Sequence, residues 1–393
     1  MMNQALHEIE SAVSARAPAS AGPDPVAGEA ATWSRVIRIL LGAGLISTRE
    51  LYSATIEVTP LSGRNSNAMV SIDKQARYVV RMSPEDPDVL TPSAEAGLLA
   101  HLRDEHGLSA VLPRCAYSSD AERCFVLDYV QHSRNLRMYW ARGHRLPAFH
   151  ASRLGTVLAV LHGSQPKAAS GWRAVRPSVL KLRRPKASNY LDSSPAVLRT
   201  IGLLQGSAPL QQALAQLEDG WQATHLCHND IRSENLLLTR SAPSARVSGL
   251  VLIDWELAGM GDPAWDLAGV FSEYAGYFID SIPTSSHFPP GRFMAWAQFG
   301  PQQVSAAAQR FWHAYSSGIA HGAGEEQAAS VLRKALGLVP ARLVQTAFER
   351  AQRKSSLELA NGMLLQLAEN MACDPRASAA IFGFADSLGA RPS

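Results

Sequence analysis

The sequence has little cysteine and little net charge. Its four cysteines, Cys115, Cys124, Cys227 and Cys373, are scattered over 393 residues, with no C-x-x-C pair and no Cys/His spacing typical of a metal site. We therefore expect buried thiols in a reduced, cytoplasmic setting. The net charge is only +3, and the dense basic stripe of a nucleic-acid-binding domain is missing. We expect no nucleic-acid partner.

Long apolar runs are also missing. No stretch approaches the ~18 apolar residues that a membrane span requires. The N-terminal region carries Glu8 and Glu10 and lacks a basic segment followed by an apolar one, so no signal peptide is visible. These absences predict a soluble protein with no membrane partner. Hydrophobic residues make up 46% of the chain, enough for a sizeable interior divided into two or three compact units.

Three regions differ in composition and periodicity. Residues 1–30 are rich in Ala, Ser, Pro and Gly, which predicts a disordered extension. Residues 31–130 combine helical periodicity with several segments of period two, which predicts a small antiparallel β-rich N-lobe. Residues 131–393 have mostly helical periodicity, which predicts a large helical C-lobe whose last long helix is split at Pro340. The predicted strands of the N-lobe are 53–60, 68–72, 78–82, 114–117 and 124–130, with a helix at 93–106. The expected fold class is α+β.

The most informative segment is residues 228–235, which reads H-x-D-x-x-x-x-N and precedes an apolar strand and Asp254. Phosphoryl transfer from ATP needs a carboxylate that receives or orients the attacking hydroxyl, and further oxygen ligands that hold Mg²⁺ against the phosphates. Asp230 fits the first role, as general base. Asn235 and Asp254 fit the second, because Mg²⁺ prefers hard oxygen ligands and a carboxylate ending a buried strand needs a cation. The segment predicts an ATP- and Mg²⁺-dependent phosphotransferase.

This loop, strand and carboxylate resemble the aminoglycoside phosphotransferase and choline kinase branch of the protein kinase-like fold. Protein kinases read H-R-D-L-x-x-x-N and D-F-G, and this chain departs from them at Asn229 and at Trp255-Glu256. Residues 261–268 extend the resemblance, since the phosphotransferases often show G-D-P-x-x-D-L there. The resemblance covers roughly residues 61–268. It implies a bilobal kinase-like fold in which Asp266 ties a helix start to the catalytic loop.

The resemblance also suggests roles for neighbouring residues. Arg232 lies where protein kinases often carry a lysine that faces the γ-phosphate, although a solvated arginine is an equal alternative. We expect His228, the remaining candidate of the catalytic group, to brace the loop through hydrogen bonds rather than to titrate. Asp128, Tyr129 and Val130 occupy the position of the hinge whose backbone meets adenine.

The predicted N-lobe carries weaker signals for nucleotide binding. The turn between its first two strands has a single glycine, Gly63, and no G-x-G-x-x-G, so by itself it is an ordinary hairpin turn. In this context its amides and the Ser66 hydroxyl are expected to donate to phosphates. Arg81 ends the third strand where kinases place a phosphate-binding lysine, and Glu95 lies where a helix carboxylate pairs with it. The alternative is an exposed glutamate and a strand-end arginine. The predicted nucleotide-binding residues of this lobe are Gly63, Asn65, Ser66, Asn67, Arg81 and Glu95.

The acceptor is less well specified. Polycationic aminoglycosides require an acidic surface, and the acceptor-facing helices are expected after Ala268. Residues 281–324 contain no Asp or Glu. This argues against an aminoglycoside, and against choline unless an aromatic cage forms. The aromatic residues of this region, most of which we expect to be core residues, are Phe288, Phe293, Trp296, Phe299, Trp312 and Tyr315.

Two further segments bear on the acceptor. The basic stretch 173–186 is either a solvated linker or a site for an acidic peptide or partner protein. Residues 341–349, 364–370 and 381–383 resemble the tail of bacterial kinase-like proteins found with HopA1-like lyases in thioamide-peptide and class V lanthipeptide pathways. That resemblance implies phosphorylation of Ser or Thr in a precursor peptide, with a HopA1-like lyase as partner.

Three functions therefore remain open. The first is a kinase for a peptide hydroxyl in peptide natural-product biosynthesis, and the second is a kinase for a small alcohol of the aminoglycoside, choline or sugar-alcohol type. The third is an inactive pseudokinase that serves as a binding module, against which the presence of Asp230, Asn235 and Asp254 argues. A hydrolase has no support, because no activated nucleophile arrangement is visible.

Overall fold

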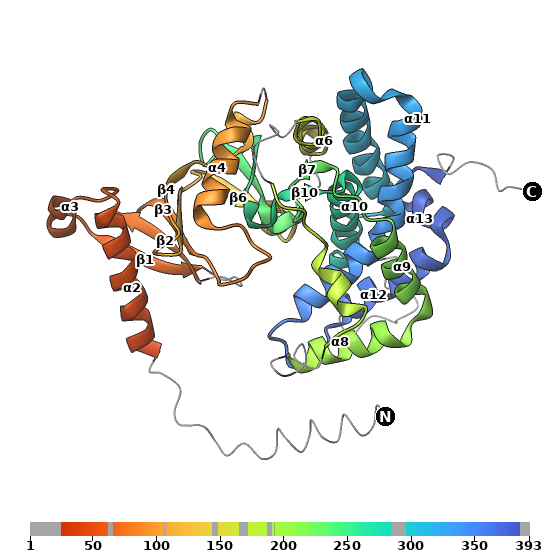
Figure 1. Cartoon of the computed structure of the whole chain (residues 1–393), viewed down its shortest axis with the longest axis horizontal. Coiled ribbons are helices and arrows are strands. Elements are labelled where there is room, and N and C mark those ends of the chain that lie inside the picture. The colour runs from red at the N-terminus through yellow and green to blue at the C-terminus, as the bar shows by residue number, and fades with distance from the viewer. Residues whose placement is uncertain are drawn as a thin grey trace, which may run out of the picture. The chain divides into compact units, whose positions relative to one another are not determined.

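The computed structural model describes residues 25–61, 66–105, 107–143, 148–164, 172–186, 191, 193–283 and 296–385. The chain divides into two compact units (Figure 1). One comprises Met1–Ser83 and Ala116–Tyr129, and the other comprises Pro84–Cys115 and Val130–Ser393. The first is rich in antiparallel strands and the second is mainly helical, which confirms the predicted α+β fold class.

The first unit is built on a five-stranded sheet with the strand order β1-β2-β3-β5-β4. Its strands are β1 Ile56–Leu61, β2 Ser66–Ile72, β3 Gln75–Met82, β4 Cys115–Ser119 and β5 Cys124–Asp128. Antiparallel pairing joins β1 to β2, β2 to β3 and β3 to β5. Side chains alternate between the two faces of each strand, and those on the inward face, such as Val70 and Val80, are fully buried in the core of this unit.

Two helices precede this sheet, α2 Pro25–Gly42 and α3 Thr48–Ser53. Val36 and Leu40 of α2 are buried in the same core as the sheet residues. Residues 25–30 therefore belong to a helix rather than to the predicted disordered extension. Proline suits the first helical position because its missing N–H would have no partner there. Residues 1–24 lie outside the described part of the chain.

Residues 84–115 belong to the second unit, although the sequence predicts one small lobe from residue 31 to residue 130. Long-range contacts explain the difference. The Leu90 N–H donates to the Glu256 carbonyl at 2.7 Å, and the short helix η1 Ser109–Val111 contacts strand β9 Val247–Leu252. Helix α4 Pro92–Arg103, which lies in this segment, is thus part of the second unit.

The second unit holds the remaining elements. Its other helices are α5 Leu136–Trp140, α6 Ala148–Gly163, η2 Ser178–Leu182, α8 Pro195–Gly206, α9 Ala208–Asp219, η3 Ser233–Asn235, η4 Trp255–Leu257, α10 Pro263–Asp280, α11 Pro301–Ala351, α12 Leu359–Cys373 and α13 Pro375–Ile381. Its strands are β6 Ser133–Asn135, β7 His225–Cys227, β8 Leu236–Arg240, β9 and β10 Gly259–Gly261. They form a three-stranded sheet, β6-β8-β9, and a two-stranded sheet, β10-β7. Helix α11 packs against α6, α10 and α12 (Figure 1).

Helix α11 continues through Pro340, so the predicted break at this proline is wrong. A proline inside a helix costs about 3 kcal/mol because it removes a hydrogen bond and crowds the preceding turn. Val339 and Leu343 on either side are fully buried, and this packing outweighs the cost. The non-helical residue of α11 is Gly324, with φ 74° and ψ 161°. Glycine adopts that positive φ without a steric penalty.

Among the described residues, no helix is both long enough and apolar enough to span a membrane.

Candidate active site

The catalytic-loop residues lie between two short strands of the second unit. Strand β7 leads into residues 228–235, and β8 and β9 then form an antiparallel hairpin that returns the chain to the loop. The Ile253 N–H donates to the Asn235 carbonyl at 2.9 Å. Asp254 directly follows Ile253, which is hydrogen-bonded to the end of the loop. The structure therefore brings Asp254 close to the loop segment 228–235, as the sequence motif predicts.

Asp230 and Asn235 form a direct hydrogen-bonded pair. The Asn235 side-chain amide donates to Asp230 Oδ2 at 2.9 Å and to the Asp230 carbonyl at 3.0 Å. Both residues are buried. Since the amide nitrogen is used within the loop, the Asn235 side-chain oxygen is the atom suited to a metal ligand.

Asp254 occupies a backbone conformation that is unusual for aspartate, with φ 66° and ψ 63°. Non-glycine residues in this left-handed region are uncommon, and they cluster at functional sites where the surrounding structure holds them. Here the neighbouring Trp255 holds the backbone in place. Its side chain is fully buried, and its Nε1 donates to the Leu252 carbonyl at 2.8 Å. The tryptophan that replaces the D-F-G phenylalanine thus anchors the chain just after the carboxylate.

His228 connects the loop with the strand that precedes Asp254. Its Nε2 lies 3.1 Å from the Ile253 carbonyl, and its Nδ1 accepts the Asp230 N–H at 3.3 Å. The ring also packs edge-to-face on Trp255, with centroids 4.6 Å apart. Burial lowers the pKa of His228, so the neutral ring is the favoured form. These contacts are those of a brace, in line with the expected role.

Asp266, in the first turn of α10, holds the backbone of the loop. Its two carboxylate oxygens accept the N–H groups of His228 and Asn229, each at 2.8 Å. This confirms the predicted link between the helix start and the loop. Asn229 itself has a φ of 65°. Neighbouring Gly261 has no room for a side chain, because an added Cβ would lie 2.3 Å from Asn229 Oδ1.

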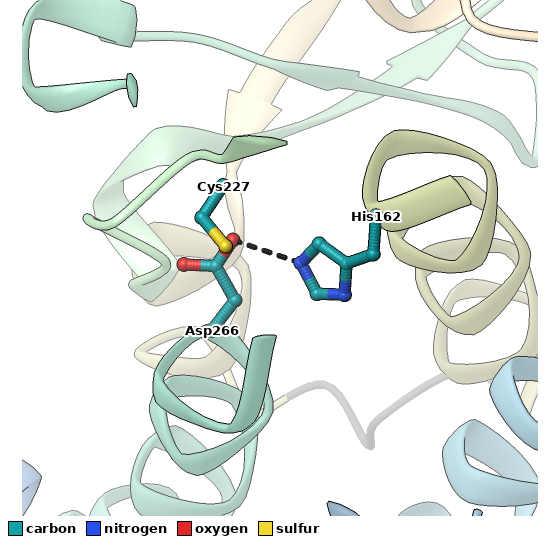
Figure 2. A group of neighbouring side chains, drawn as sticks. All are labelled: His162, Cys227 and Asp266. Atoms are coloured by element: carbon teal, nitrogen blue, oxygen red, sulfur yellow. Dashed lines mark hydrogen bonds and ion pairs between the residues drawn. The ribbon is translucent and has the colours of Figure 1, made fainter. Parts of the chain in front are cut away.

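His162 and Cys227 lie beside Asp266, a group that the sequence analysis missed (Figure 2). His162 points from α6 toward Asp266, with Nε2 3.2 Å from Oδ2, and its Nδ1 lies 2.9 Å from the Tyr315 hydroxyl. All three members are buried, and burial raises the pKa of the Cys227 thiol. Because the Asp266 oxygens already accept the two loop amides, we interpret the group as a brace behind the loop. No short-range sequence pattern links these three residues.

Replacing Asp266 with Asn is expected to destabilise the protein by about 1.5–3 kcal/mol, the worth of a hydrogen bond to a charged group, because one of the two loop N–H groups loses its acceptor. Burial opposes ionisation of Asp266, but hydrogen bonds from His162 and from the loop outweigh it and hold the pKa below its ordinary 3.8. The stabilisation is therefore present above about pH 4 and is lost as the pH falls. The free energy of unfolding of both proteins is measured by chemical denaturation between about pH 3 and pH 7, a range that begins just below the ordinary aspartate pKa. A variant as stable as the parent would contradict this role.

Arg232 contacts the predicted base directly. Its Nε lies 3.3 Å from Asp230 Oδ2, and its Nη1 lies 2.9 Å from Glu349 Oε2. The Asp230 carboxylate raises the pKa of Arg232 against the opposing effect of burial, with Glu349 adding to it. Arg232 is therefore not a solvated arginine. Glu349 lies in α11, 117 residues away in sequence, and sequence reasoning did not identify it as a site residue.

The first unit contains most of the predicted nucleotide-binding residues. Gly63 and Asn65 lie outside the described residues, and so does the side chain of Ser66. Asn67 on β2 pairs in register with Arg81 on β3, which places two of the predicted residues side by side. Arg81 is buried, and its guanidinium lies over the Phe125 ring at 5.1 Å.

The predicted hinge falls at the boundary of the two units. Asp128 ends β5 and pairs with Tyr78, and the Tyr129 N–H donates to the Arg77 carbonyl at 2.8 Å. Val130 belongs to the second unit, as does Glu95 on α4, which is buried rather than an exposed helix residue. The pairing of Glu95 with Arg81 stays a prediction.

A cavity of about 320 Å³ adjoins Arg232 within the second unit. Its wall is formed by charged and polar side chains, with Ala360 as the exception. The described lining residues are Arg137, Arg232, Glu234, Glu273, Asp280, Arg342, Gln345, Thr346, Glu349, Arg350, Lys354, Glu358, Ala360 and Asn361.

The expectation that residues 281–324 supply an acceptor wall without carboxylates does not hold for this cavity. The wall comes from α5, the catalytic loop, α10 and the end of α11 onward, and it includes carboxylates. Phe299 and Tyr315 are buried in the core, as expected for most of these aromatic residues, whereas Trp296 is exposed. Residues 284–295 lie outside the described part of the chain. Residues 281–324 do lack carboxylates, but long-range packing brings carboxylates from other segments to this cavity.

The basic stretch 173–186 is tied down by contacts within the second unit. Lys181 pairs with Asp88, Arg183 pairs with Glu218, and Arg173 donates to the carbonyl of Asp88. Part of this stretch lines a second cavity, of about 420 Å³. These contacts argue against a solvated linker.

Comparisons with known proteins agree with this geometry. The model of the phosphotransferase enzyme family matches residues 57–327. A thiamine kinase from Escherichia coli O81 (strain ED1a) is 32% identical over 218 residues, which cover 54% of this chain and 64% of the relative. The chain thus spans less than two thirds of the length of that relative.

Solved structures show the same fold at low identity. An ethanolamine kinase from Plasmodium vivax aligns with a TM-score of 0.54 and 14% identity, covering 95% of this chain and 96% of its own. A choline kinase from Cryptosporidium parvum Iowa II aligns with a TM-score of 0.51 and 11% identity, covering 88% and 95%. With the catalytic loop assembled as described and most of the sequence matched by the family model, this chain belongs to the phosphotransferase enzyme family.

Proposed function

We propose that the protein transfers the γ-phosphoryl group of ATP to an acceptor hydroxyl. The observation that carries this proposal is the assembly of Asp230, Asn235 and the residue before Asp254 by direct hydrogen bonds. Phosphoryl transfer depends on positioning and charge stabilisation rather than on covalent chemistry by the protein. A loop that holds one carboxylate next to an amide ligand and a second carboxylate meets this requirement.

Asn235 and Asp254 are the residues that would hold Mg²⁺. An amide oxygen and a carboxylate are a hard donor set, which fits this ion and does not favour softer metals. When bound, the ion with ATP supplies the phosphoryl group and neutralises its charge. Arg81 and Asn67 are proposed to contact the phosphates, and the backbone of Asp128–Val130 the adenine.

Asp230 is proposed to orient the acceptor hydroxyl and to accept its proton. Asp230 Oδ2 already contacts Asn235 and Arg232, so Oδ1 is the oxygen available for the acceptor. The Asn235 and Arg232 contacts hold the carboxylate in one orientation, which is what a positioned base needs. The buried, neutral His228 fixes the loop and moves no proton in this scheme.

Replacing Arg232 with Met is expected to lower the rate of transfer roughly 10- to 100-fold. The variant removes the cation whose Nε lies 3.3 Å from Asp230 Oδ2, so the carboxylate loses part of its fixed orientation. Each factor of ten in rate corresponds to about 1.4 kcal/mol of transition-state stabilisation. Steady-state kinetics measures the change. The matched control is Arg333→Met, an exposed arginine on α11. An unchanged rate in Arg232→Met would show that Arg232 is not needed for transfer and has only a structural role.

We further propose that the acceptor hydroxyl belongs to Ser or Thr of a peptide, with a HopA1-like lyase as the partner that acts on the phosphorylated product. The support comes from the cavity beside Arg232, because Gln345, Thr346 and Glu349 on its wall belong to the tail segment 341–349. That segment carries the resemblance to peptide-modifying kinases. A cytoplasmic location belongs to the same proposal and is supported by the four cysteines, which are free thiols.

The acceptor class is tested by incubating the protein with MgATP and two acceptor pools. One contains Ser- and Thr-rich peptides, with and without proteins encoded by neighbouring genes, and the other contains thiamine, choline, aminoglycosides and sugar alcohols. Mass spectrometry identifies the phosphorylated product. A phosphorylated peptide supports the peptide acceptor, and a phosphorylated small alcohol assigns the protein to small-molecule kinases instead. MgATP binding without any transfer would support the pseudokinase.

A further inference from the structure

Arg342 is a buried cation for which the described residues provide no carboxylate partner. Its side chain is 3% exposed and lines the cavity beside Arg232. One nitrogen, Nη2, donates to the Ile231 carbonyl at 2.6 Å, and the guanidinium lies over the Trp265 ring at 4.8 Å. Its Nε and Nη1 have no hydrogen-bond partner. A buried charge is strongly disfavoured without a counter-charge, so an anionic partner is expected.

The other cations on the cavity wall are already paired. Arg350 binds Asp280 through two contacts of 2.7 and 2.9 Å, and Lys354 lies 2.8 Å from Glu358. Arg137 lies 3.3 Å from Glu234, and Arg232 binds Glu349. The unbalanced positive charge of the wall is therefore that of Arg342.

Glu273 does not supply the missing counter-charge. It lies on the same wall and accepts the Ser233 N–H at 2.9 Å. Burial raises its pKa, and the neighbouring Glu234 raises it further. A ligand in this cavity therefore meets Arg342 as a cation that has no ion pair among the described residues.

Two buried amides on the wall lack partners as well. Asn361 is 1% exposed, and both its Oδ1 and its Nδ2 are without hydrogen bonds. Gln345 donates from Nε2 to Glu349 at 3.0 Å, and its Oε1 has no donor. Buried polar groups in native proteins are normally satisfied. Asn361 Oδ1 and Gln345 Oε1 are therefore expected to accept hydrogen bonds from N–H groups of a ligand.

We propose that this cavity binds an acceptor that carries a carboxylate and an N–H group beside its hydroxyl, with Arg342 holding the carboxylate and Gln345 and Asn361 contacting the N–H. The inference rests on the proposed phosphotransfer and deepens it by naming the chemistry of the acceptor. Arg342 contacts Ile231, the residue after the base, so a group bound to Arg342 lies close to the catalytic loop. A free hydroxy amino acid, or a Ser or Thr at the C-terminus of a peptide, has this combination of groups. An internal Ser or Thr residue lacks the carboxylate, and so does a cationic alcohol.

The test compares matched probes with the full-length protein. N-Acetyl-L-serine carries the hydroxyl, the N–H and the carboxylate, whereas N-acetyl-L-serinamide lacks the anion, and glycerate lacks the N–H. Calorimetry without nucleotide measures binding, and MgATP-dependent phosphorylation measures transfer. Binding of N-acetyl-L-serine is expected to be about 10-fold or more tighter than binding of the amide, the size of a charged hydrogen bond. Glycerate is expected to bind between the two.

Arg342→Met is expected to bring the ratio between the acid and the amide close to one, while Arg333→Met leaves it unchanged. Because Arg342 is buried, the melting temperature and MgATP affinity of each variant show whether it is folded, and Arg342→Lys keeps the charge if the Met variant is not. Equal binding of acid and amide by the wild type, or tighter binding of choline, would overturn the proposal. Carboxylate-selective binding without any transfer would instead count against the phosphotransfer.

Discussion

Replacing Asp254 with Ala is expected to abolish Mg²⁺-dependent binding of ATP. Asp254 provides the carboxylate of the proposed metal pair, and Mg²⁺ is usually held by one or two carboxylates together with substrate phosphates. The backbone of Asp254 adopts a φ of 66°, and buried Trp255 holds it there, so the fold maintains an unfavourable conformation at this residue. Calorimetric titration with ATP, with and without Mg²⁺, measures the effect.

The control for this variant is Asp219→Ala, which removes an exposed aspartate at the end of α9. Its Mg²⁺-dependent affinity should match that of the wild type. Asp254→Asn separates charge from conformation, because asparagine tolerates positive φ well. If Asp254→Ala binds MgATP as tightly as the parent, Asp254 is not a metal ligand.

Replacing Asp230 with Asn is expected to lower transfer by roughly 10²- to 10⁴-fold, the range typical of losing a general base. The asparagine is almost isosteric and can still accept the hydrogen bond that Asn235 donates to Asp230 Oδ2. It cannot take the acceptor proton. Nucleotide binding should therefore persist while turnover falls.

Single-turnover measurements under saturating MgATP isolate this step from binding. Asp219→Asn serves as the matched control, since it makes the same chemical change at an exposed site. A fall in turnover that is matched by an equal loss of ATP affinity would indicate a metal-binding or structural role for Asp230. Full turnover would exclude it as the base.

The catalytic loop was predictable from the sequence because its chemistry is local. Asp230, Asn235 and Asp254 lie within one loop and one hairpin, so their order along the chain already implies their proximity in space. The link from Asp266 to the loop was predicted from the resemblance to the phosphotransferases and not from a local pattern, because 37 residues separate Asp266 from Asn229. The strand pattern of the first unit likewise follows from period-two alternation.

The rest of the site depends on long-range packing that no local pattern reveals. His162 reaches Asp266 across 104 residues, and Arg342 reaches Ile231 across 111. Glu349 pairs with the catalytic-loop arginine in the same way. At Pro340 the local pattern gave a wrong prediction. Proline strongly favours a helix break, but burial of its neighbours outweighs that preference and the helix continues.

Phosphate transfer to a hydroxyl by the loop around Asp230 underlies all of these proposals. The most direct measurement follows the γ-phosphate of labelled MgATP in the wild type and in Asp230→Asn, with MgATP binding measured on the same samples. We expect label on an acceptor hydroxyl with the wild type and almost none with the variant, although both bind MgATP. Equal labelling by the two proteins, or a wild type that binds no MgATP, would contradict it.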